Sequence, residues 1–377
     1  MRASVLPDAR QRKQAGRFVW LSIDTENPGN AAFLERFPIA TYPTFLVVDP
    51  REERATLKWQ GSASVEQIVN LLADADRRRP RGPDAVLARA DRAQAEGRID
   101  DATRDYVTAL NEGGRGWSRR PRAVESLVLA LSGAGRLEGC ADTALREARA
   151  LPRGPSFANA VATGLVCAVS APPDAAWRPA ALAGLEPLAR EALALPGLLA
   201  DDRSGLYETL VDTRVVCGDR REAHALAERW WRFLEEDRRR APSAELRAAL
   251  DGPRVAAALA LEDPARALPA LAASEAALPA DFNPPYRSAR LLFELGRFED
   301  ARAAAGRALG RAYGGRKLAV YRLAADIERK AGDRAAAARV LDEAIAYAEK
   351  LPPPQQRPDL VASLRAQRGA LHEGTAP

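Results

Sequence analysis

The 377-residue chain carries 56 lysine and arginine residues against 51 acidic ones, so its net charge is only +5. The two signs alternate along the sequence, and no basic stripe interleaved with aromatic side chains marks a nucleic-acid surface. No uninterrupted apolar run reaches the roughly 18 residues that a membrane-spanning helix needs. We therefore expect a globular protein of about two to three domains, with no nucleic acid among its partners and no integral membrane segment.

The first eight residues carry a positive charge but lack the apolar stretch of a signal peptide. If Met1 is the true start, we expect a cytoplasmic protein. If an upstream signal peptide has been lost, we expect a periplasmic or exported protein instead.

The first predicted strand covers residues 18–23, Phe-Val-Trp-Leu-Ser-Ile, which are apolar at both alternating positions. This pattern is typical of a strand that is buried on both faces of a sheet. Asn30 then offers a suitable N-cap for a short helix over residues 31–37.

Two further strands and a helix follow. Residues 44–48 form a second apolar run, and residues 56–60 alternate in polarity before Gly61. Residues 62–75 have the spacing of a helix that begins near Ser64, with one apolar face made by Val65, Ile68, Leu71 and Leu72. The predicted order is strand, helix, strand, strand, helix.

This order resembles the second half of the thioredoxin fold, as do the sequence Tyr-Pro-Thr-Phe-Leu-Val-Val-Asp-Pro, the later Trp-Gln-Gly and the serine-capped last helix. The resemblance covers residues 1–76 and implies an incomplete α/β thioredoxin-like N-terminal domain. It also implies that Pro43 follows a cis peptide bond and that Tyr42, Pro43 and Thr44 form a substrate-side loop. A generic α/β fragment is the alternative interpretation, and it explains the position of Pro43 less easily.

The family places a Cys-x-x-Cys pair upstream of this half, and the chain contains none. Residues 1–13 correspond only to the rear of the helix that such a pair opens. We hypothesise that Met1, the sole methionine, is an internal residue taken as the start, with the cysteine pair encoded just before it. The chain as it stands therefore predicts no catalytic residue in this domain.

Cysteine and histidine are sparse. Cys140, Cys167 and Cys217 show no metal or redox spacing, and we interpret them as buried small residues. The two histidines, His224 and His372, have no neighbouring cysteine, histidine or nucleophile motif. We therefore predict no metal, no cofactor and no Ser/His or Cys/His catalysis.

After a charged linker at residues 77–84, strand patterns disappear and Ala, Leu, Arg and Glu dominate. Gly97, Gly296 and Gly332 are each followed by alanine after five residues and again after seven more. Glycine ends a helix in a left-handed conformation, and alanine lets paired helices approach closely. The spacing resembles tetratricopeptide repeats, whose period is about 34 residues. It predicts an all-α solenoid over residues 85–350.

Weaker copies of the repeat occur after Gly135, after Gly218 and around Asp263, whereas residues 150–205 show no clean repeat. We interpret the region as a degenerate solenoid, and the alternative is an irregular helical domain with chance spacing of glycine and alanine. Residues 351–377 are expected to form a proline-rich turn, a short helix and a tail.

A solenoid presents a long concave face that suits an extended peptide or a partner helix. We therefore expect protein or peptide clients. Trp230, Trp231 and Phe233 form an aromatic cluster that we assign to the core rather than to a binding site, because aromatic side chains dominate buried area.

The sequence is compatible with two functions. The chain is a redox-inactive thioredoxin-like module joined to a protein-binding scaffold, or it is a fragment or mis-started form of a thiol-disulfide oxidoreductase whose Cys-x-x-Cys lies upstream of Met1. The absence of the cysteine pair favours the first. Insulin reduction by this chain that persists after replacement of its three cysteines would contradict the view that catalysis needs upstream residues.

Overall fold

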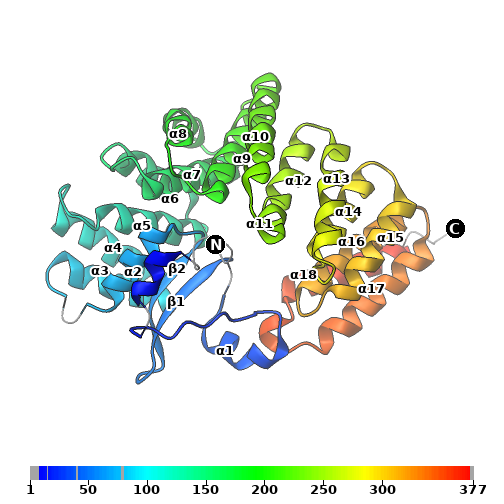
Figure 1. The fold of residues 1–377 in the computed structure, drawn as a ribbon, viewed down its shortest axis with the longest axis horizontal. Helices are drawn as coiled ribbons and strands as arrows, with labels where there is room; N and C mark the ends of the chain where they lie inside the picture. Colours follow the sequence, from blue (N-terminus) through cyan, green and yellow to red (C-terminus); the bar gives the residue numbers. More distant parts are fainter. Residues whose placement is uncertain (1–7, 15, 40, 78–79, 374–377) are drawn as a thin grey trace. The chain divides into compact units, whose positions relative to one another are not determined.

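The structure, a computed structural model, describes residues 8–14, 16–39, 41–77 and 80–373. The described chain is mostly helical and falls into two compact units. Unit 1 comprises Met1–Phe18 and Ala40–Leu234, and unit 2 comprises Val19–Ile39 and Glu235–Pro377. The chain therefore passes from one unit to the other three times, as the colours of Figure 1 allow the reader to follow.

Unit 1 is built from helices that pack in chain order. From α3 to α9 each helix contacts the next one along the chain. The helices of unit 1 are α2 (Val65–Ala75), α3 (Pro83–Ala95), α4 (Ile99–Gly113), α5 (Arg120–Gly133), α6 (Leu137–Ala148), α7 (Pro155–Ser170), α8 (Arg178–Leu193), α9 (Ala200–Val216) and α10 (Arg220–Arg240), whose last residues belong to unit 2. A 3-10 helix, η1 (Ala9–Gln14), precedes them.

Two strands of the predicted three are present, and both lie in unit 1. They are β1 (Thr44–Asp49) and β2 (Arg54–Gln60), which pair antiparallel as a hairpin. Ser64 caps α2 by accepting a hydrogen bond from Gln67 N, while the Gln67 side chain accepts one from Ser64 N. The predictions of these two strands and of this helix are confirmed.

The predicted strand over residues 18–23 is wrong. Residues 19–24 have no regular secondary structure, and Val19 and Leu21 are 88% and 76% exposed. A strand forms only where its backbone groups find a neighbouring strand, and the sheet of the described residues contains β1 and β2 alone. An α/β thioredoxin-like domain is therefore not confirmed, although the Tyr42–Pro43 peptide bond is cis, as the resemblance implies.

The glycines that mark the predicted repeats have the left-handed backbone conformation. At Gly97 the chain makes the hydrogen bond typical of such a helix end, from Arg98 N to Ala93 O at 2.8 Å. Near Asp263 the same bond runs from Asp263 N to Ala258 O. Here Glu262, at φ 55°, stands where the other turns have glycine. The same turn occurs in the other clear copies of the repeat, at Gly296 and Gly332, and in the weaker copies, at Gly135 and Gly218.

The alanines of the repeat lie where paired helices meet. The helices of each pair, α3 with α4, α14 with α15 and α16 with α17, pack directly against each other. The six alanines are at most 1% exposed: Ala102, Ala109, Ala301, Ala308, Ala337 and Ala344. These contacts and turns confirm a tetratricopeptide-like helical repeat fold.

Residues 150–205 also fold into paired helices, although their sequence shows no clean repeat. Helix α7 packs directly against α8. Glycine lets both of these helices approach α6 of the preceding hairpin. A Cβ atom added to Gly164 of α7 would overlap the Cβ of Ala144 in α6. One added to Gly184 of α8 would lie 2.8 Å from Cδ1 of Leu145. The helical array therefore continues through this region.

Core assignments from the sequence are confirmed in part. Trp230 and Trp231 are 1% and 6% exposed, as expected of core residues. Cys140 and Cys167 are fully buried, but they form a disulfide that joins α6 to α7, with a Cα–Cα distance of 6.3 Å. The interpretation of Cys217 as buried is wrong, because it is exposed at the C-cap of α9.

Unit 2 combines the C-terminal hairpins with a segment from near the N-terminus. That segment contains η2 (Pro28–Asn30) and the predicted short helix, α1 (Ala31–Arg36). Asn30 makes no capping hydrogen bond, contrary to expectation; Asn27 instead caps η2 by accepting from Gly29 N. The other elements are α11 (Ala244–Ala249), α12 (Asp251–Ala260), η3 (Pro264–Ala267), α13 (Leu268–Ala277), α14 (Asn283–Glu294), α15 (Phe298–Arg311), α16 (Arg316–Lys330), α17 (Arg334–Glu349), η4 (Pro353–Gln355) and α18 (Pro358–Glu373), which lies along α17.

Candidate binding interface

The loop predicted to form a substrate-side wall lies at the start of β1. Tyr42 is half exposed, and Thr44 Oγ1 donates a hydrogen bond to Thr41 O at 2.5 Å. Pro43 O accepts a hydrogen bond from Gly61 N, which follows β2, at 2.8 Å. The three predicted residues thus form the entry to the hairpin, and their role as a client contact stays a prediction.

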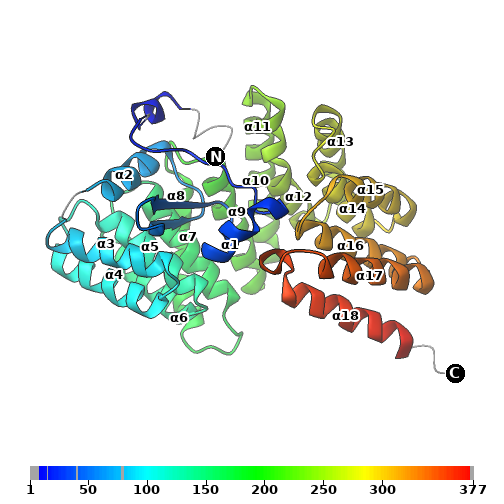
Figure 2. The ribbon, with the colours of Figure 1, turned by 90° about the horizontal axis from the view of Figure 1, so that it is seen from below.

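A more extensive interface in unit 1 was not predicted. The hairpin and α2 lie against the side of the unit formed by α3, α5, α7 and α9, the first helices of successive hairpins; we call it the first-helix face. Strand β2 packs against α3, and side chains of residues 62–74 contact residues of α5 and α9. Figure 2 shows α2 and the strands beside these helices. The helical array therefore already holds another segment of polypeptide.

The apolar part of this interface is a small core beneath the hairpin. Leu57 and Trp59 of β2 pack with the apolar face of α2, and the partly buried Leu199, at the N-cap of α9, joins them. Trp59 is 3% exposed and its Nε1 donates to Ser62 O at 3.2 Å. This core gives the hairpin and α2 a common anchor.

The polar part of the interface centres on two buried carboxylates of the first-helix face. Glu125 of α5 accepts hydrogen bonds from Gln67 Nε2 at 3.0 Å and from Asn159 Nδ2 of α7 at 2.7 Å, and it is 1% exposed. Burial raises its pKa to about 7. Asp202 of α9 accepts a hydrogen bond from Ser62, and burial raises its pKa to about 6. Each carboxylate thus meets a polar partner from the docked segment.

We expect these groups to make unit 1 less stable as the pH rises. Burial raises the pKa of Glu125 above its value in the unfolded chain, so the folded form keeps a proton that the unfolded form releases between pH 4.5 and about 7. Over that range the free energy of unfolding should fall by about 3 kcal/mol for Glu125 alone. The variant E125Q should lack this part of the decrease in stability with pH. Thermal unfolding followed by circular dichroism from pH 5 to 8 measures the slope of stability against pH.

The exposed Glu138 of α6 provides the matched control, since E138Q removes a carboxylate of the same kind outside the interface. E138Q should keep the wild-type slope. An E125Q slope equal to that of the wild type would show that the Glu125 carboxyl is not buried at this interface.

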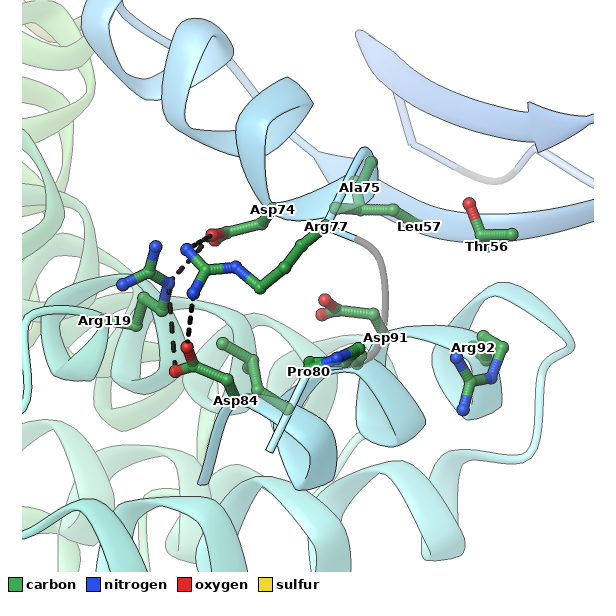
Figure 3. A pocket seen from close by; sticks show the side chains of 12 residues that line it. Thr56, Leu57, Asp74, Ala75, Arg77, Pro80, Asp84, Asp91, Arg92 and Arg119 are labelled. Carbon is green, nitrogen blue, oxygen red and sulfur yellow. Dashed lines mark hydrogen bonds and ion pairs between the residues drawn. The ribbon is translucent and has the colours of Figure 1, made fainter. Parts of the chain in front are cut away.

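A cavity of about 130 Å³ lies at one end of the interface, where α2, α3 and the start of α5 meet. Figure 3 shows charged side chains of α2, of α3 and of Arg119, the N-cap residue of α5, around it. Arg119 Nε lies 2.8 Å from Asp74 Oδ1, and Arg77 Nη1 lies 2.8 Å from Asp84 Oδ2. The carboxylates that line this cavity are thus held in ion pairs.

One of its carboxylates belongs to a buried network. Asp91 Oδ2 lies 2.6 Å from Arg122 Nη2, and the Tyr106 hydroxyl donates to Asp91 Oδ1 at 2.9 Å. Asp91 is 4% exposed and Tyr106 is fully buried. Burial raises the pKa of the Asp91 carboxyl, and the Arg122 charge opposes that rise. This network ties α3, α4 and α5 together beneath the docked segment.

Other kinds of site are not found in the described part of the chain. It contains no cluster of three or more histidine, cysteine or acidic side chains arranged to hold a metal ion. Of the helices between residues 8 and 373 that the structure describes, none has both the length and the apolar character that crossing a membrane requires.

Sequence reasoning missed Glu125, Asn159 and Asp202. One signal for Glu125 was present, because it stands inside the run Ala-Val-Glu-Ser-Leu-Val, where an acidic residue interrupts a helix face that is otherwise apolar. Asp202 gave no such signal, since an acidic residue in the first turn of a helix is ordinary.

The chain is similar to solved structures of other proteins, but its sequence matches no protein-family model and no curated protein. Among solved structures, a tetratricopeptide repeat protein from Parabacteroides merdae is similar over 75% of this chain and 98% of that chain, with 8% identity and a TM-score of 0.48. The TPR2AB domain of yeast Sti1, solved as a pHSP90 complex, is similar over 76% and 98% of the two chains, with 15% identity and a TM-score of 0.29.

A thermophilic TPR protein from Thermus thermophilus is similar over 77% of this chain and 98% of that chain, with 14% identity and a TM-score of 0.26. The helical repeat fold of the present chain rests on its own turns and helix contacts, described above.

Proposed function

We propose that this protein is a protein-interaction scaffold whose helical repeats bind segments of other polypeptides. One observation carries the proposal: the first-helix face of unit 1 already holds a hairpin and a helix of the same chain, through an apolar core and through matched polar contacts. A face that holds one polypeptide segment in this way has the chemistry to hold another.

The polar contacts give such a face selectivity. Glu125 and Asp202 are buried, and each needs a hydrogen-bond donor from whatever covers it, because an unpaired buried carboxylate is costly. Gln67 and Ser62 supply these donors in the structure. A segment that lacks donors at both places should be rejected.

Selection from a phage-displayed library of random 12-residue peptides, with the folded wild-type chain immobilised, tests the proposal. We expect a related set of peptides to be enriched, and photo-crosslinkers in those peptides to label first helices of hairpins such as α9, α14 or α16. The failure of any peptide to be enriched over an unrelated immobilised helical protein would overturn the proposal. Labelling confined to outer helices such as α4 and α6 would overturn it as well.

A relation to thioredoxin-like proteins is a second and narrower proposal. It is supported by the succession of β1, β2 and α2, by the serine cap of α2, and by the position of Pro43 directly before β1. On this proposal Tyr42, Pro43 and Thr44 contact the client, and the protein is redox-inactive as it stands. Crosslinking of selected peptides to Tyr42 would support it, whereas their labelling of helices alone would count against it.

A further inference from the structure

Unit 2 holds an acidic turn of its own chain in a polar site. The turn runs from Asp24 to Asn27, where Asn27 N donates to Asp24 O at 3.3 Å, and η2 follows at once. It lies against residues between α15 and α16 and against η4, and all of these belong to unit 2. The proposal of a scaffold function rests on the first-helix face of unit 1 and does not involve this site.

Both carboxylates of the turn are bound. The Tyr313 hydroxyl donates to Asp24 Oδ2 at 2.7 Å. Glu26 accepts from the backbone N of Arg316 at 2.9 Å, and its other oxygen lies 3.2 Å from Arg316 Nε. Arg316 is the first residue of α16, so Glu26 also meets the positive end of a 15-residue helix.

The backbone of the turn is recognised separately. Gln355 of η4, 3% exposed, donates from its Nε2 to the carbonyls of Thr25 and Asn27 at 2.9 and 3.0 Å. A buried amide aimed at two carbonyls of one turn is a built site rather than a chance contact. Gly314 allows the approach, since an added Cβ there would lie 2.5 Å from Glu26 O.

The recognition is confined to the turn and to the helix after it. Val19 and Leu21, just before the turn, are 88% and 76% exposed and contribute little packing. After the turn, α1 contacts η4. A cavity of about 250 Å³ borders the two carboxylates and extends towards Phe282 and Arg311, so the site has room beside the turn.

We propose that this site is a receptor for acidic turns, and that it accepts an Asp-x-Glu-Asn-Pro turn of a partner protein in place of residues 24–28. The proposal rests on the scaffold function and gives it a ligand class. The segment in the structure acts as a tethered competitor, because it belongs to the same chain as the site and therefore binds it intramolecularly. Its contacts are a few hydrogen bonds and one ion pair whose arginine side chain is 42% exposed, which makes exchange feasible.

A fluorescein-labelled peptide of residues 20–37, titrated against the full chain by fluorescence anisotropy, tests the proposal. The receptor variant D24K/E26K should release its own turn, because a lysine ammonium in place of the Glu26 carboxylate would face the Arg316 guanidinium and the positive end of α16. We expect this variant to bind the peptide at least about 10-fold more tightly than the wild type. The peptide with Asn in place of Asp24 and Gln in place of Glu26 should lose about 10-fold or more of that affinity.

Two further variants separate recognition from release. E35K reverses an exposed charge on α1 outside the contacts, and it should bind the peptide as weakly as the wild type. Adding G314V to D24K/E26K should abolish binding, because the valine side chain would occupy the position of Glu26. If D24K/E26K loses helical circular dichroism, E26Q is the milder release variant.

Equal binding by the wild type and the release variant, or equal binding of the acidic and amide peptides, would overturn the proposal. If library peptides still label first helices in that case, the scaffold function stands and only this site assignment falls. Analytical ultracentrifugation distinguishes the source of the turn. A wild-type chain that stays monomeric points to a foreign partner, and concentration-dependent dimers that G314V abolishes point to a second copy.

Discussion

Replacing Cys140 and Cys167 together by alanine should lower the free energy of unfolding of unit 1 by about 3 kcal/mol. The bond joins α6 to α7 across a sequence separation of 27 residues, and its loss lets the unfolded chain explore conformations that the closed loop forbids. In a unit of this size the midpoint of thermal unfolding should fall by roughly 10 °C. Alanine is preferable to serine, because both positions are fully buried and a serine hydroxyl would need a partner.

The measurement is thermal unfolding followed by circular dichroism without reductant, for C140A/C167A and for the control C217S. Cys217 is exposed and outside the disulfide, so C217S should unfold like the wild type. Thiol titration of the denatured wild-type chain should find a single reactive thiol, that of Cys217. Reactivity of all the cysteines in that titration would contradict the disulfide itself.

Replacing Arg122 by methionine should cost unit 1 about 3–5 kcal/mol, because the change leaves the Asp91 carboxylate buried without its charge partner. The pair is close, with Arg122 Nη2 at 2.6 Å from Asp91 Oδ2, and both side chains are nearly inaccessible to solvent. Removing the positive charge further raises the pKa of Asp91, so R122M should lose more stability at pH 8, where the carboxyl must ionise, than at pH 5.

The double variant D91N/R122M is the matched control. Asparagine keeps the shape and still accepts the Tyr106 hydrogen bond, so most of the lost stability should return. Denaturant unfolding of the wild type, D91N, R122M and D91N/R122M at pH 5 and pH 8 completes this double-mutant cycle. An R122M chain within about 1 kcal/mol of the wild type at pH 8 would show that Asp91 and Arg122 are not a buried pair.

Features that depend on local chemistry could be predicted from the sequence. Gly97, Gly296 and Gly332 adopt a left-handed conformation because glycine has no Cβ, and that property is visible without any structure. Ser64 and Gln67 form a capping box from their spacing alone. The strands at residues 44–49 and 54–60 pair with each other across a short turn.

Features that depend on a distant partner could not be predicted. The apolar run at residues 18–23 reads as a strand, yet only Phe18 makes an isolated bridge, and residues 19–23 have no regular secondary structure. The disulfide joins cysteines that only the packing of α6 on α7 brings together. Gln355 resembles a solvent-facing residue until the acidic turn is placed over it, and the apolar run around Glu125 does not reveal that Gln67 is its partner.

The threefold passage of the chain between the units has a consequence for dissecting the protein. Unit 2 is not a contiguous piece of gene, because its acidic turn and α1 are encoded before the hairpin of unit 1. A chain of residues 235–377 alone would lack both the acidic turn and α1. Conversely, a protease cut in the stretch before Thr44 would separate that turn from the hairpin that follows it, while its link to the preceding segment of unit 1 and its contacts to Gln355 would stay in place. Truncation boundaries for this protein therefore decide which segments occupy its sites.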